Sequence, residues 1–122
     1  SGFGEAQVNL KILGMLILFT IAQIVSWYQS NSLLLNDWLK DNFIYVCLVL
    51  APITGILFAY GTKVGYEAIG TLWSVRFSAF AVGYLTFIVL TWYHLGEDPF
   101  TWKNIVTSLL CFAILAVQAF WK

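Results

Sequence analysis

Four long apolar runs constrain the fold of this chain more than any other feature of its sequence. They cover residues 10–28, 43–60, 68–93 and 102–121. A helix rises about 1.5 Å per residue, so a run of about 20 residues matches the roughly 30 Å of bilayer hydrocarbon. Membrane β-strands alternate apolar and polar residues, and these runs do not. The sequence therefore predicts an all-α, integral membrane four-helix bundle that forms a single domain over residues 1–122.

The composition points to the same class of protein. Of the 122 residues, 61% are hydrophobic and only 10% are charged, whereas soluble domains are about 25% charged. The segments between the runs are short and polar, which predicts antiparallel neighbours in an up-down bundle. We expect a multi-pass protein of the cell inner or plasma membrane, with the lipid bilayer as its first partner. Six basic and six acidic residues give no reason to expect nucleic acid.

The sequence predicts neither an enzyme nor a metal or cofactor site. Cys47 and Cys111 both lie inside apolar runs, where cysteine is typical of packing. The single histidine, His94, is followed by Glu97 and Asp98, a pattern more typical of a solvated turn than of a zinc site. There is also no nucleophile–base pair and no glycine-rich phosphate loop.

The main candidate for function is Arg76, which is the only Lys, Arg, Asp or Glu residue in the run 68–93. A charge inside a membrane span costs a few kcal/mol on insertion scales and is by default a functional hypothesis. Helical spacing predicts that Trp73, Arg76, Phe80 and Gly83 share one face. A guanidinium stacks on aromatic rings and binds carboxylate or phosphate with two hydrogen bonds. This interpretation makes Arg76, Trp73 and Phe80 part of an anion-binding cavity.

A structural interpretation of Arg76 has equal weight. Helical side chains lean toward the helix N-terminus, and a helix that begins at residue 68 puts Arg76 about 12 Å from the preceding loop by helical rise. The side chain could then extend to the headgroup level and act only as an anchor.

A second polar stripe lies in the first run. Thr20, Gln23 and Trp27 follow one another at helical spacing. Buried polar side chains in membranes seek partners on neighbouring helices. We interpret Gln23 as an interhelical contact, with substrate contact by Gln23 and Thr20 as the alternative. Gln23 cannot titrate, so it cannot carry a coupling proton.

The turn before the last run resembles a known family. Its residues read Leu95-Gly96-Glu97-Asp98-Pro99-Phe100-Thr101-Trp102. This is similar to the Leu-Gly-Glu-x-x-(Thr/Ser)-Trp turn between the last two helices of the drug/metabolite transporter superfamily. The chain length resembles the small multidrug resistance branch and other half-size, EamA-like members. The resemblance covers the last two runs by motif and the first two only by layout.

The resemblance implies a chain that dimerises to form a transporter, often with antiparallel subunits. Small multidrug resistance proteins bind cations and protons through a glutamate in the first helix, and here Gln23 occupies that region. This departure argues against proton-coupled export of cations. With Arg76 as the buried charge, we expect a homodimeric transporter or lipid flippase for an anionic or zwitterionic small molecule or lipid. The alternative is a structural or accessory subunit of a membrane complex, which does not transport.

Overall fold

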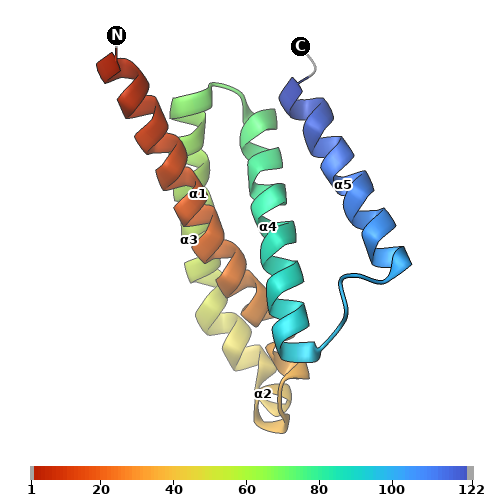
Figure 1. The fold of residues 1–122 in the computed structure, drawn as a ribbon. Coiled ribbons are helices and arrows are strands. Elements are labelled where there is room, and N and C mark those ends of the chain that lie inside the picture. Colours follow the sequence, from red (N-terminus) through yellow and green to blue (C-terminus); the bar gives the residue numbers. More distant parts are fainter. Residues whose placement is uncertain (1, 121–122) are drawn as a thin grey trace.

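The structure, a computed structural model, describes residues 2–120, and all regular secondary structure in them is helical. Four long helices follow one another with a short helical segment after the first (Figure 1). The elements are α1 (Gly2–Asn31), a 3₁₀ turn η1 (Ser32–Leu34), α2 (Asp37–Asp41), α3 (Phe43–Ile69), α4 (Leu72–Leu95) and α5 (Trp102–Phe120).

Local sequence signals set several of these boundaries. Asn36 caps α2, because its side chain accepts a hydrogen bond from the Leu39 amide at 2.8 Å. Thr101 caps α5, since its Oγ1 accepts a hydrogen bond from the Asn104 amide at 3.3 Å. Gly70 ends α3 with a φ of 87°, which is left-handed backbone that favours glycine.

The predicted boundary between the second and third helices is wrong. The helix expected over 43–60 continues to Ile69, and the next begins at Leu72 rather than at residue 68. Gly61 and Gly65 suggested a loop, but both are buried inside α3. They lie against the Phe19 ring and the Met15 side chain of α1, so these glycines allow close packing of two helices rather than a turn.

Three of the helices, α1, α3 and α4, pack together and hold the core. The core residues, Met15 and Phe19 from α1 with Val75 and Ala79 from α4, are buried. Phe58 of α3 packs against them from the third side. The core therefore lies near the middle of α1 and the first half of α4.

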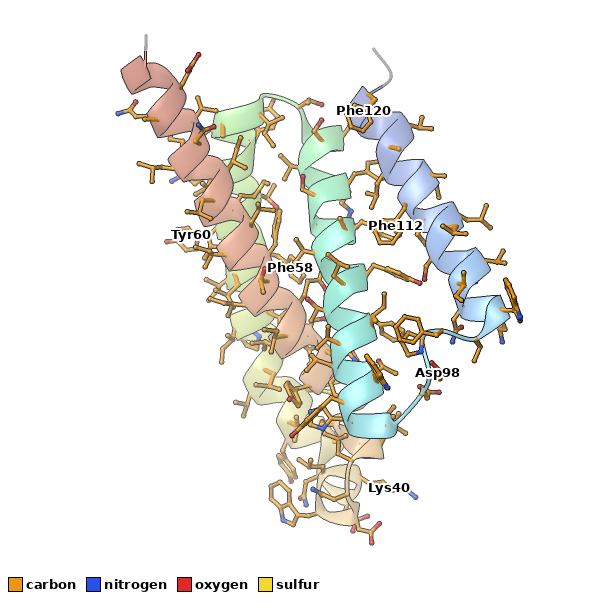
Figure 2. The ribbon with its side chains drawn as sticks, in the orientation of Figure 1. Lys40, Phe58, Tyr60, Asp98, Phe112 and Phe120 are labelled. Atoms are coloured by element: carbon orange, nitrogen blue, oxygen red, sulfur yellow. The ribbon has the colours of Figure 1, made fainter. Side chains whose placement is uncertain are left out.

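The fourth long helix, α5, lies beside this three-helix unit and packs mainly against α4 (Figure 1). The all-α prediction is confirmed, while the four-helix bundle stays a prediction, because α5 packs mainly against α4 and not within the three-helix unit. Tyr84 and Ser108 share a hydrogen bond of 2.7 Å across the interface, and the Tyr84 ring meets Phe112 edge-on at 6.3 Å. Figure 2 shows Phe112 reaching from α5 into the space beside α4.

The long helices are the part of the fold that is compatible with a bilayer. Within residues 2–120, α3, α4 and the segment Gly4–Leu34 are long and apolar enough to cross a membrane, and a shorter apolar helix covers Trp102–Val117. Large apolar side chains are exposed along all of them, including Leu48 and Val49 on α3. The fourth crossing stays a prediction, and residue 121, its predicted last residue, lies outside the described part of the chain.

Candidate functional site

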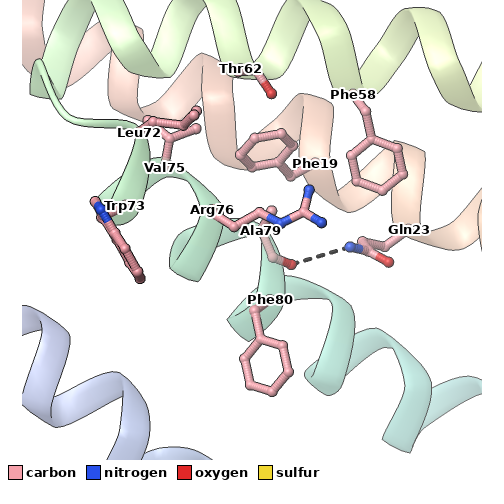
Figure 3. A pocket seen from close by; sticks show the side chains of 10 residues that line it. All are labelled: Phe19, Gln23, Phe58, Thr62, Leu72, Trp73, Val75, Arg76, Ala79 and Phe80. Carbon is pink, nitrogen blue, oxygen red and sulfur yellow. Dashed lines mark hydrogen bonds between the residues drawn. The ribbon is translucent and has the colours of Figure 1, made fainter.

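A pocket of about 810 Å³ lies where α1, α3 and α4 come together (Figure 3). It is open on one side and combines apolar walls with a few polar groups. Its lining residues are Phe19, Gln23, Phe58, Thr62, Leu72, Trp73, Val75, Arg76, Ala79 and Phe80. This volume is within the range of about 300–1,000 Å³ typical of small-molecule sites.

Helical spacing on α4 explains why one helix supplies most of the wall. Residues three and four apart lie on one side of a helix, so Leu72, Arg76 and Ala79 line the same face. Trp73, Arg76 and Phe80, the candidate residues of the third run, all line this wall. Their role in binding stays a prediction.

Arg76 is the only charged residue that lines the pocket. Figure 3 shows its guanidinium within the pocket, on the side of Phe58 and Gln23 and away from the turn that joins α3 to α4. The extension toward that turn, expected under the anchor interpretation, is therefore not observed. Within residues 2–120, no hydrogen bond or ion pair of the Arg76 side chain is found. The side chain is exposed and its donors are available to a ligand.

Arg76 also lies closer to the end of its helix than the sequence implied. Since α4 begins at Leu72, Arg76 is about 6 Å from the helix start by helical rise. With the predicted helix start at residue 68, this distance would be about 12 Å. The charge therefore lies near one end of the apolar part of the molecule rather than at its centre.

Gln23 connects two helices, as its interhelical interpretation predicted. Its Nε2 donates to the Ala79 carbonyl at 3.2 Å. The amide lies flat against Gly83, where an added Cβ would meet Nε2 at 2.7 Å and Cδ at 2.8 Å. Gln23 lines the pocket as well, so the alternative of ligand contact stays a prediction.

The aromatic residues of α4 are arranged differently from the expected face. Trp73 is 69% exposed and stacks with Phe77 at 6.2 Å, and Phe80 meets the same Phe77 ring edge-on at 6.5 Å. Phe77, which the helical-face argument omitted, is therefore the residue that links the two rings. Thr20 is exposed, donates to the Leu16 carbonyl at 2.7 Å, and is not among the pocket-lining residues.

Sequence reasoning missed the walls from the other helices. Phe19 directly precedes Thr20 in the sequence and was therefore not counted in the polar stripe of the first run. Phe58 and Thr62 belong to a helix that was expected to end at residue 60. Helical spacing relates residues within one helix, whereas the register between α1 and α3 depends on packing. A longer predicted α3 would have made Thr62 a candidate.

A second, smaller cavity of about 210 Å³ follows the first along α1 and α4. Its lining is more polar than that of the first, and it comprises Gln23, Ser26, Trp27, Ser30, Asn31, Gly83 and Phe87. Gln23 belongs to both cavities. Its side chain therefore lies at the boundary between a large pocket near Arg76 and a polar cavity toward the other end of the helices.

An aromatic cluster around His94 lies beyond the smaller cavity. The Tyr28 hydroxyl and His94 Nε2 are 2.8 Å apart, and the Trp27 and His94 rings stack at 5.3 Å. Trp27 Nε1 donates to Thr91 Oγ1 at 3.1 Å in a buried contact. His94 thus joins the end of α4 to the end of α1, whereas the sequence had suggested a solvated turn. Among the described residues, no group of three or more His, Cys, Asp or Glu side chains could hold a metal ion.

Comparison with known proteins adds no family to this description. No protein-family model matches the chain, and neither a curated protein nor a solved structure matches it. The resemblance to drug/metabolite transporters therefore stays a prediction from the Leu95–Trp102 turn. The functional proposal therefore depends on the geometry of the pocket.

Proposed function

We propose that this chain is a small integral membrane transporter or flippase that binds an anionic or zwitterionic molecule at Arg76. The observation that carries the proposal is a guanidinium inside an open pocket of about 810 Å³ between three helices, with no side-chain partner among the described residues. A fixed cation in a mainly apolar pocket favours a negatively charged ligand, because the low dielectric strengthens their attraction. The bidentate geometry of arginine suits carboxylate or phosphate.

The rest of the molecule supports a membrane carrier over a soluble binding protein. Three helices have the length and composition to cross a bilayer. A large pocket and a polar cavity meet at Gln23, so polar groups continue along α1 and α4 beyond the Arg76 pocket. In line with the half-size transporters that the last turn resembles, the proposed working unit is a pair of copies in the cell membrane.

The proposal is tested by transport in proteoliposomes. We expect the purified chain to take up radiolabelled inorganic phosphate, an alkyl phosphate or a short carboxylate faster than empty vesicles. Arg76→Ala should reduce that uptake at least about tenfold, because a hydrogen bond to a charged group contributes about 1.5–3 kcal/mol. Lys40→Ala is the control, since Lys40 lies in α2, away from the pocket. Equal uptake by Arg76→Ala and the unaltered protein would refute the site.

One observation favours the second candidate, an accessory membrane subunit. Helix α5 packs mainly on α4 and exposes large apolar side chains along its length, among them Val106, Leu109, Leu110, Phe112, Ile114 and Val117. A subunit of this kind would use α5 for contact with another membrane protein. It would show no uptake in the vesicle assay, with or without Arg76, which separates it from the transporter.

A further inference from the structure

We infer that the Arg76 pocket takes a lipid-like anionic amphiphile, with its phosphate or carboxylate head at Arg76 and its hydrocarbon chain on the apolar wall of the pocket. This inference rests on the proposed membrane location. It narrows the proposed ligand from any anionic or zwitterionic molecule to one class. Two observations lead to it: the level of Arg76 along the helices and the composition of the pocket wall.

Arg76 lies at the level where charged residues begin on the neighbouring helix. Val75 Cγ2 lies 3.2 Å from the position of a Cβ on Gly65, so Arg76 and Lys63 lie within about one helical turn of each other in height. From Lys63 back to Phe43, α3 carries no charge, a distance of about 30 Å by helical rise. This equals the hydrocarbon thickness of a bilayer. The backbone of Arg76 therefore lies near the headgroup level, and its guanidinium extends from there into the pocket, on the side of Phe58 and Gln23 (Figure 3).

The composition of the wall separates a lipid from a small free anion. Only Arg76, Thr62 and Gln23 offer polar side chains, and the other seven lining residues are apolar. A free phosphate would occupy the polar end and leave the apolar surface uncovered. An amphiphile covers both, since its head pairs with the cation and its chain lies on the rings.

The experiment compares three probes on the purified full chain in detergent. Native mass spectrometry measures binding of phosphatidic acid, phosphatidylcholine and glycerol phosphate. We expect phosphatidic acid to bind at least about tenfold more tightly than either of the others, because only it combines an unshielded anion with a chain. Glycerol phosphate binding as tightly as phosphatidic acid would show a small-anion site and overturn the inference. Equal binding of phosphatidylcholine would overturn it too, because the head charge would then not be recognised.

Two matched variants locate the site. Arg76→Gln should weaken phosphatidic acid at least about tenfold, while Lys63→Gln, which removes a charge at the same height outside the pocket, should change it less than about twofold. Arg76→Lys should restore part of the affinity, since it keeps the charge without the bidentate fork. A loss that is equal in Arg76→Gln and Lys63→Gln would show general surface attraction and refute the site. Circular dichroism of each variant checks that the helices are intact.

A spectroscopic readout places the chain of the lipid. Phosphatidic acid with brominated acyl chains should quench part of the tryptophan fluorescence, and Trp73→Phe should remove most of that quenching, because Trp73 lines the pocket. Quenching that is unchanged in Trp73→Phe would put the lipid elsewhere.

Uptake of small anions through Arg76 without lipid binding would refute this inference and leave the proposed transporter standing. Lipid binding through Arg76 without any transport or lipid transfer would support this inference and refute the proposed transporter.

Discussion

At the scale of single residues, the site depends on how a charge and an amide are held. Arg76 has an open position with its donors unused, whereas Gln23 is fixed by the Ala79 carbonyl and by the absence of a side chain at Gly83. The sequence identified Arg76 and Gln23 because polar residues stand out in apolar runs. It could not show that Arg76 and Thr62 share a pocket, because they belong to different helices.

Gly83→Ala should displace Gln23 and destabilise the protein by about 1–3 kcal/mol, the usual effect of overpacking. The added methyl group would lie 2.7 Å from Gln23 Nε2, so the hydrogen bond to Ala79 must break or move. The measurement is the free energy of unfolding in detergent. The matched control is Gly55→Ala, since a Cβ at Gly55 meets nothing within 4 Å. Equal stability of the two variants would contradict the tight contact.

At the scale of helices, prediction from the sequence was most reliable where apolar composition alone determines whether a segment forms a helix. Each of the four apolar runs forms a helix over its described residues, apart from Gly70 and Thr71. The end of α3 was misplaced because glycine serves both turns and close helix contacts, and only the neighbouring Phe19 ring shows which role Gly61 has. The outlying position of α5 was also missed, because periodicity shows which face is apolar and not what covers it.

Tyr84→Phe should loosen α5 from α4. Tyr84 and Ser108 form the side-chain hydrogen bond between the two helices over residues 2–120, at 2.7 Å. Such a bond in a membrane protein contributes about 0.6 kcal/mol on average, so we expect a small loss of stability but a wider distribution of α4–α5 distances. Spin-label distance measurements between the helices test this. Phe112→Leu, which keeps the hydrogen bond, is the comparison. An unchanged distance distribution in Tyr84→Phe would mean that the apolar contact alone holds α5.

At the scale of the whole molecule, charged residues gather at the two ends of the long helices. Lys11 and Glu67 form an ion pair of 3.3 Å at one end, and Lys40 and Asp98 mark the other (Figure 2). The exposed Lys11–Glu67 pair contributes little to stability. The separation of the ends is what a transmembrane position requires, since the apolar surface between them needs lipid around it.

Cysteine accessibility tests this position directly. In a chain with Cys47→Ser and Cys111→Ser, a cysteine placed at Glu5 and one placed at Asp98 should react with a membrane-impermeant maleimide from opposite sides, because an odd number of long helices separates them. A mixture of both patterns for each site would indicate dual insertion. Reaction of both sites from one side only would contradict three crossings.

The shortest connection between two long helices in the described chain has a mechanical consequence. Only Gly70 and Thr71 separate α3 from α4, and the Gly70 backbone is in a conformation that other residues rarely adopt. If the two helices rotated relative to each other about this connection, the Arg76 pocket would lie close to the axis of rotation. Since α4 is about 36 Å long by helical rise, a rotation of about 5° there would move its far end by about 3 Å. A ligand that wedges Thr62 and Arg76 apart would thus move His94, at the opposite end, most of all.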